Sequence, residues 1–273
     1  MLLKDKKHIL ASALLGAVLI GAAVLAGIRL YAYIHRAPRT VRLTIPIVRT
    51  TPELAGRLAA HLDADSAELM TAFSDVALID SLGYDEQTLP AMFIPNTYEV
   101  YQWITPRNLL LRLKKENDDF WTSQRRRQAR EQGLTPIEVM TLASIVEQET
   151  ACDAERATIA GLYLNRLRKG MRLQADPTVK YAVGDFSLKR VLKVHLKCDS
   201  PYNTYEHEGL PPGPICIPSL ASIKAVLKPA SHNYIYMCAK EDFSGTHNFA
   251  VTAAEHLRNA QNYANALNKA GIR

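Results

Sequence analysis

Near its N-terminus the chain carries twenty consecutive residues, 9–28, that include one serine and no charged side chain. A helix of this length can span the hydrocarbon core of a bilayer. A cleaved signal peptide is the alternative, because lysines precede the run, although the run is long for such a peptide. We therefore predict a retained transmembrane helix over 9–30, preceded by a short segment over 1–8.

The charges around this segment leave its orientation open. Lysines precede it, and four arginines follow it, so the positive-inside rule is nearly balanced. The whole chain has a net charge of +6, which suits anionic lipid, an anionic cell wall or nucleic acid. No nucleic-acid-binding motif is present, and the arginines at 125–127 are typical of a solvated helix face. We expect no nucleic-acid partner.

Beyond the apolar run, helix-start signals and short β-branched runs predict a mixed α+β fold, without the regular alternation of a parallel sheet. Thr135 with Glu138, and Thr252 with Glu255, have the spacing of a capping box. We predict a stalk and helical subdomain over 31–133 and a second domain over 134–273. Helices are expected from Thr51 onward and over 65–73, 106–132, 135–150, 153–169 and 252–269, and strands over 45–51 and 234–239.

The cysteines and histidines show no pattern of metal ligands. The four cysteines form no CxxC pair, and the eight histidines lack ligand spacing, so we predict neither a metal site nor a cofactor. In an oxidising compartment one or two disulfides could form, and the sequence leaves their pairing open. The four are Cys152, Cys198, Cys216 and Cys238.

Two glutamates, Glu147 and Glu149, stand at the C-terminal end of the apolar helix expected over 135–150. In a helix, residues three, four and seven positions earlier share a face with a given side chain. Glu149 then follows an apolar stripe, whereas Glu147 follows a smaller and more polar one. The stripe of Glu149 is Val146, Ile145 and Leu142, and that of Glu147 is Ser144, Ala143 and Met140.

The position of Glu149 has a functional and a structural interpretation. A carboxyl held against apolar surface at a helix C-terminus has a raised pKa and can donate a proton to a glycosidic oxygen. Alternatively, Glu149 forms an ion pair with Arg156 or Lys169 at the helix end. The pattern by itself leaves both open.

The residues at 143–150, Ala-Ser-Ile-Val-Glu-Gln-Glu-Thr, resemble the signature of the endolytic murein transglycosylases, the MltG or YceG-like family. Further blocks match in family order, from near Phe93 to the C-terminus. These blocks are 163–167, 170–179, 202–205, 209–215, 222–225 and 247–249. The resemblance implies that Glu149, the glutamate before Thr150, is the catalytic residue, and that Glu147 has a structural or supporting role.

The resemblance also implies a lysozyme-like catalytic domain and a lyase reaction. Glu149 would protonate the oxygen between N-acetylmuramic acid and N-acetylglucosamine, then remove the proton of the muramic acid 6-hydroxyl, leaving a 1,6-anhydro end. Such cleavage would act on nascent peptidoglycan and could end strand elongation. The alternatives are a peptidoglycan-binding protein without activity and a glycan hydrolase, for which Asp176 would be the second carboxylate.

Several polar residues in the matching blocks suit contacts with sugar hydroxyls and acetamido groups. As the substrate-binding set we predict Gln174, Asp176, Tyr202, Asn203, Thr204 and Asn165. Asp176 is also typical of a simple helix start, with Pro177 in the first turn. The loop over 210–214, rich in proline, is expected to form a rigid wall, with His247 as a buried partner.

The chain departs from the family's pattern after the membrane segment. A LysM-like module usually follows there, but here the stalk leads almost directly to Val41-Arg42-Leu43, which resembles the strand after that module. The module is therefore predicted to be missing. The resemblance implies an inner-membrane protein whose N-terminus lies in the cytoplasm and whose catalytic domain lies in the periplasm. Peptidoglycan strands and, by analogy, peptidoglycan synthases are the expected partners.

Overall fold

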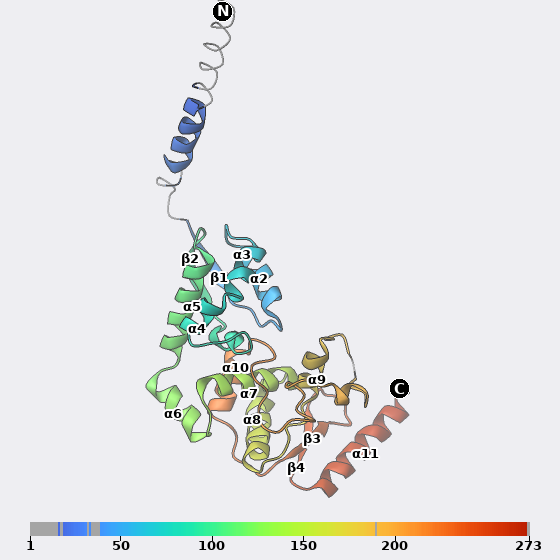
Figure 1. The fold of residues 1–273 in the computed structure, drawn as a ribbon. Helices are drawn as coiled ribbons and strands as arrows, with labels where there is room; N and C mark the ends of the chain where they lie inside the picture. The colour runs from blue at the N-terminus through green and yellow to red at the C-terminus, as the bar shows by residue number, and fades with distance from the viewer. Residues whose placement is uncertain (1–15, 17–18, 32, 34–38, 189, 272–273) are drawn as a thin grey trace, which may run out of the picture. The chain divides into compact units, whose positions relative to one another are not determined.

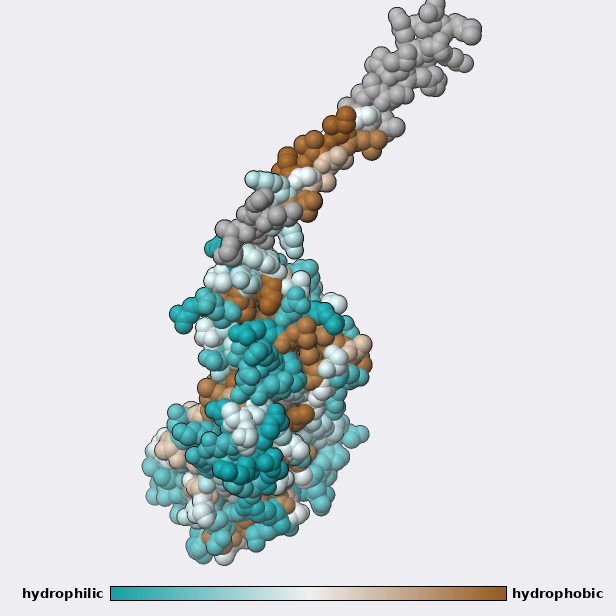
Figure 2. Space-filling view, turned by 90° about the vertical axis from the view of Figure 1, so that its left-hand side faces the viewer, coloured by the Kyte–Doolittle hydropathy of each residue, from teal (hydrophilic) through white to brown (hydrophobic). Residues whose placement is uncertain are grey.

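The structure, a computed structural model, describes residues 16, 19–31, 33, 39–188 and 190–271 (Figure 1). Contacts divide the chain into two units, Met1–Val41 and Arg42–Arg273. The first unit contains a helix over 19–31 whose apolar side chains are exposed. Figure 2 shows this stretch as an almost continuous hydrophobic surface. An apolar helix surface of this kind indicates a membrane or another apolar partner.

Within the described ranges, no helix has both the length and the apolar character needed to cross a bilayer. The span predicted over 9–30 begins at residues outside those ranges, as does the segment over 1–8. The membrane anchor therefore stays a prediction.

The second unit is mostly helical with two small sheets, which confirms the α+β class. The predicted boundary at 133/134 falls inside this unit, between a helix that ends at Glu131 and one that begins at Pro136. The domain division stays a prediction. The elements of the second unit are β1 (Thr40–Thr44), α2 (Thr51–Ala59), α3 (Ser66–Phe73), α4 (Val76–Ser81), η1 (Leu89–Met92), β2 (Thr97–Tyr101), α5 (Pro106–Phe120), α6 (Ser123–Glu131), α7 (Pro136–Glu149), α8 (Asp153–Arg168), α9 (Asp176–Val183), η2 (His195–Lys197), α10 (Leu220–Leu227), β3 (Tyr236–Ala239), β4 (His247–Ala250) and α11 (Ala253–Lys269).

The strand predicted over 45–51 is wrong. The strand is β1, which ends at Thr44 and pairs with β2. The amide of Ile45 still donates to the Asn96 carbonyl at 2.9 Å, but Pro46 has no N–H to continue the ladder. Four residues later, Thr50 caps α2 by accepting a hydrogen bond from Glu53 N at 3.3 Å.

The single helix predicted over 106–132 is wrong as well, because the chain breaks it into α5 and α6. Trp121 leaves the helical conformation and is 3% exposed. Thr122 then caps α6 through its hydroxyl, which accepts from Arg125 N at 3.3 Å. Burial of a large aromatic ring together with a new N-cap outweighs the helix propensity of the flanking residues.

The core of the second unit surrounds α7. Every residue over 139–146 is buried, and α10 and α8 both pack against this helix. The capping box of Thr135 and Glu138 at its start is present as predicted. A helix buried on all sides leaves only its end for polar side chains, and Glu147 and Glu149 lie there.

Two further features lie beside the cavities described below. In the proline-rich loop, a Cβ at Gly213 would lie 2.0 Å from the Gln87 carbonyl oxygen, so this loop can approach the segment before η1 only with glycine at that position. Strands β3 and β4 pair antiparallel, with Ala239 opposite His247. The strand predicted at 234–239 thus starts at Tyr236, and it is half-buried because a two-stranded sheet has exposed edges.

Candidate active site

The two glutamates at the end of α7 have different surroundings. Glu147 Oε2 accepts hydrogen bonds from Ser219 Oγ at 2.5 Å and Ser222 Oγ at 2.7 Å, and it pairs with Arg156 at 3.1 Å. The side chains of this ion pair are both 9% exposed. The structure therefore assigns Arg156 to Glu147, not to Glu149. This contact removes Arg156 from the ion-pair interpretation of Glu149.

Glu149 instead faces a cavity of about 250 Å³. The hydroxyl of Tyr163, on α8, donates a hydrogen bond to its Oε1. The cavity is lined from α7, α8, the start of α9 and the loop before it, the loop at Tyr205, β3 and β4. Its residues are Glu149, Leu162, Tyr163, Arg166, Leu173, Gln174, Asp176, Tyr205, Met237, Cys238, Ala239 and His247.

The environment of Glu149 favours its protonated form. Burial raises its pKa from the ordinary value of 4.5 to about 7, although the hydrogen bond from Tyr163 acts in the opposite direction. The nearby charge of Asp176 adds to the rise. Burial also holds the pKa of the Tyr163 hydroxyl well above its ordinary value, so that hydroxyl stays a donor. A carboxyl of this kind can act as a general acid near neutral pH.

Two residues of the predicted substrate-binding set line this cavity with Glu149, namely Gln174 and Asp176. Gln174 has a φ of 47°, in the left-handed region that residues other than glycine rarely adopt. The carboxylate of Asp176 accepts a hydrogen bond from Tyr205 Oη at 2.6 Å. Asp176 is the first residue of α9 and Ala175 is its N-cap, so Asp176 does not cap the helix.

Four residues of the set do not line the cavity, and three of them make hydrogen bonds within the protein instead. Asn203 is fully buried and donates to the carbonyls of Leu196 and Cys198, both at 2.9 Å. Thr204 is 1% exposed, and its hydroxyl accepts from Ala175 N at 3.0 Å. Asn165 donates to backbone carbonyls ahead of β3. Their hydrogen bonds hold loops in place, and the Thr204 carbonyl also accepts from Gln174 N at 3.0 Å.

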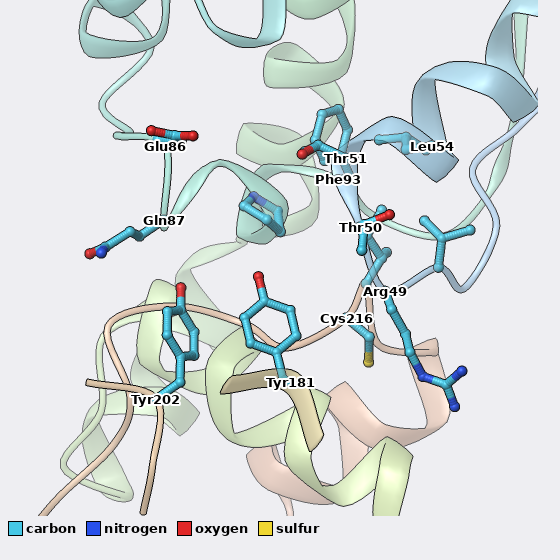
Figure 3. Close-up of a pocket in the computed structure, with 13 residues that line it drawn as sticks. Arg49, Thr50, Thr51, Leu54, Glu86, Gln87, Phe93, Tyr181, Tyr202 and Cys216 are labelled. Atoms are coloured by element: carbon cyan, nitrogen blue, oxygen red, sulfur yellow. The ribbon is translucent and has the colours of Figure 1, made fainter. Parts of the chain in front are cut away.

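Tyr202, the sixth member, lies in a second cavity of about 340 Å³ (Figure 3). Its ring and that of Tyr181 point toward Glu86, Gln87 and Phe93, with Arg49 at the other end. This cavity is larger, but its one carboxylate, Glu86, is exposed, whereas burial raises the pKa of Glu149 at the end of α7. We therefore place the candidate active site in the smaller cavity of Glu149.

Four further polar residues line this cavity and were not predicted from the sequence as site residues: Tyr163, Arg166, Tyr205 and His247. Tyr163 and Arg166 share a helix face at a spacing of three, and both are buried. Polar side chains on a buried helix face were the available signal. For Tyr205 and His247 no local signal existed, because each reaches the cavity from a separate segment.

Comparisons with known proteins identify the family and its fold. Residues 25–262 match the model of the YceG-like family. The chain belongs to the YceG-like family. The match starts well before Phe93, near which the resemblance was expected to begin. The family's fold is present too: a crystal structure of a YceG-like protein from Listeria monocytogenes superposes with a TM-score of 0.68 at 29% identity, covering 80% of this chain and 75% of that one.

Curated relatives of this YceG-like chain carry the name endolytic murein transglycosylase. The Bacillus subtilis protein is 32% identical over 216 residues, which are 78% of this chain and 59% of the relative. The Streptococcus pneumoniae D39 protein is 28% identical over 258 residues, which are 84% of this chain and 46% of the relative. The chain therefore spans about half the length of the curated relatives it matches.

Proposed function

We propose that this YceG-like chain is an endolytic lytic transglycosylase that cleaves the bond between N-acetylmuramic acid and N-acetylglucosamine in peptidoglycan. The observation that carries the proposal is the carboxyl of Glu149, which faces a cavity, accepts a hydrogen bond from Tyr163 and has a pKa of about 7. The names of the relatives, endolytic murein transglycosylase, support the substrate class.

In the proposed reaction, protonated Glu149 gives its proton to the glycosidic oxygen as the bond to the muramic acid C1 breaks. The resulting Glu149 carboxylate then takes the proton of the 6-hydroxyl while that oxygen bonds to C1. The products are a free 4-hydroxyl on N-acetylglucosamine and a 1,6-anhydro end, and no water is consumed. One carboxyl suffices because it acts first as acid and then as base, and the substrate supplies the nucleophile.

Around the reacting bond, Gln174 and Asp176 are the proposed sugar contacts, because their side chains line the same cavity as Glu149. Asn203, Thr204 and Asn165 act in this proposal by holding the loops that carry these contacts. Tyr202 would meet only a part of the glycan that extends into the second cavity.

A hydrolase is the second candidate function, because Asp176 lies in the same cavity as Glu149. A second carboxylate there could activate water and give reducing ends. In the structure, the Asp176 carboxylate accepts a hydrogen bond from Tyr205 Oη at 2.6 Å, which suits a binding role equally well.

Product analysis distinguishes these functions. The full-length chain in detergent would be incubated with purified peptidoglycan, and the new ends would be identified by mass spectrometry. Anhydro-muramic ends are the expected result. Reducing ends would establish the hydrolase instead, and intact strands would contradict both and leave a glycan-binding protein.

We also propose that the chain is anchored in the inner membrane by the segment over 9–30, with the catalytic domain in the periplasm beside peptidoglycan synthases. The exposed apolar side chains of the helix over 19–31 support the anchor. A carbonate wash of membranes tests it: the chain should stay in the pellet, and release into the wash would contradict the anchor.

The pH profile of the reaction follows from the pKa of Glu149. The first step needs protonated Glu149, so kcat/KM should fall as pH rises through about 7. Tyr163→Phe removes the hydrogen bond that lowers this pKa, so the alkaline limb should move to higher pH. The measurement is kcat/KM between pH 5 and 9. Tyr101→Phe, at an exposed tyrosine of β2, is the control and should leave the limb in place. A limb that moves to lower pH in Tyr163→Phe would contradict this account.

A further inference from the structure

His247 begins β4 and lines the cavity that contains Glu149. Its position follows from the pairing of β4 with β3, which sets His247 opposite Ala239, another cavity residue. From the sequence, this histidine was expected only as a buried partner of the proline-rich loop. Its contacts indicate a different role.

Glu155, on α8, holds His247 by two hydrogen bonds. Glu155 Oε1 accepts from the His247 backbone N at 2.8 Å, and Oε2 lies 3.0 Å from Nδ1 of the ring. The side chains are 12% and 15% exposed. A carboxylate only accepts hydrogen bonds, so Nδ1 carries the hydrogen. Glu155 therefore sets both the orientation of the ring and the location of its proton.

The second ring nitrogen, Nε2, belongs to a side chain that lines the cavity. It makes no hydrogen bond within the described part of the chain. Among the described residues, the one buried side-chain nitrogen or oxygen without a partner is His256 Nδ1, so Nε2 of His247 is not shut away from solvent. In a neutral ring whose Nδ1 carries the hydrogen, Nε2 has a free lone pair.

A purely structural histidine would have both nitrogens occupied by the protein, as His232 does. Its Nδ1 accepts from Tyr234 N at 3.1 Å, and its Nε2 lies 3.0 Å from the Thr158 carbonyl. His247 instead has one nitrogen fixed by a carboxylate and one without a protein partner among the described residues, in a side chain that lines the cavity of the candidate active site. A nitrogen of this kind is available to a ligand.

We propose that His247, held by Glu155, is a substrate-binding residue whose Nε2 accepts a hydrogen bond from an N–H or O–H group of the sugar beside Glu149. This inference rests on the proposed function, because it takes a glycan as the ligand of the cavity. It adds a recognition residue, with Glu155 as its positioning residue, to the machinery around Glu149.

Two substitutions separate this role from a structural one. Asparagine at 247 places an amide N–H near the position of Nδ1 and can still donate to Glu155, but it leaves no acceptor at the position of Nε2. Glutamine reaches further and places its amide oxygen near Nε2, at the expense of the contact with Glu155. If His247 binds the substrate, the His247→Gln variant should bind glycan more tightly than the His247→Asn variant. If its role is structural, His247→Gln should bind glycan more weakly than His247→Asn.

Binding would be measured in the Glu149→Gln background, so that the glycan stays intact. The probe is uncrosslinked peptidoglycan glycan strands, and the full-length chain is used in detergent. His247→Asn should weaken binding about tenfold, the usual effect of one lost hydrogen bond, with an unchanged unfolding temperature. His247→Gln should recover part of the affinity. His61→Asn, at an exposed histidine outside the cavity, is the matched control and should bind like the parent.

The outcomes separate the two proposals. Equal binding by His247→Asn and the parent would overturn the role of His247 and leave the proposed function intact. Weaker binding by His247→Gln than by His247→Asn would also overturn it, as would a loss of affinity explained by a lowered unfolding temperature. If the parent binds no glycan strands, both the inference and the choice of glycan as ligand fail.

Discussion

Glu149→Gln is expected to lower kcat by at least about 10³-fold, the order of magnitude that general acid–base catalysis contributes in one proton transfer. Both proposed steps use this carboxyl, and an amide can neither donate the proton nor take it back. Release of anhydro-muramic ends by the full-length chain, quantified by mass spectrometry, is the measurement. KM should change little, because the amide fills the same volume in the cavity.

The same substitution should make the folded chain more stable at pH 8. Folded Glu149 has a pKa of about 7 and an ordinary glutamate one of 4.5, so the folded state binds this proton more tightly. The contribution of this bound proton to the free energy of unfolding is fully present below about pH 4.5 and is lost as pH rises through about 7. Thermal unfolding at pH 5 and pH 8 should show a gain for Glu149→Gln only at the higher pH. Full activity in Glu149→Gln would refute the assignment of the catalytic residue.

Glu147→Gln is expected to destabilise the chain by about 3 kcal/mol, because it leaves the buried charge of Arg156 without its buried carboxylate partner. The unfolding midpoint should fall by roughly 8 °C for a domain of this size. Differential scanning calorimetry of the full-length chain in detergent measures this. Activity per folded molecule should be retained, since Glu147 is bonded to Ser219 and Ser222 and does not line the cavity.

Asp153→Asn is the matched control for this loss. Asp153 also contacts Arg156, at 2.8 Å, but its side chain is 78% exposed. Exposed ion pairs contribute about 0–1 kcal/mol, so this variant should unfold close to the wild-type temperature. If Asp153→Asn and Glu147→Gln lower the midpoint equally, burial does not determine the strength of the Glu147–Arg156 pair. Loss of activity in a fully folded Glu147→Gln variant would contradict the structural role of Glu147 and indicate that Glu147 takes part in catalysis.

Local signals predicted the helices well where the helix end carried its own hydrogen bonds. The capping boxes of α7 and α11 were visible as Thr-x-x-Glu, and both are present. The same reasoning failed at Trp121, where burial of one aromatic ring breaks the helix that its neighbours favour. It failed also at Ile45, where β-branched residues suggested a strand that Pro46 ends. At Trp121, packing against core residues distant in sequence decided the local conformation.

For the candidate site, local sequence patterns were enough to predict that two carboxyls stand at the end of an apolar helix, because a period of 3.6 residues and a capping box are local properties. The motif blocks also indicated the family, and with it the preference for Glu149. Only the tertiary structure decided that Arg156 pairs with Glu147 and that Tyr163 bonds Glu149. Likewise, it separated Gln174 and Asp176, which line the cavity, from Asn203 and Thr204, which hold its loops. Contacts between α7, α8, β4 and two loops depend on packing, which no local pattern encodes.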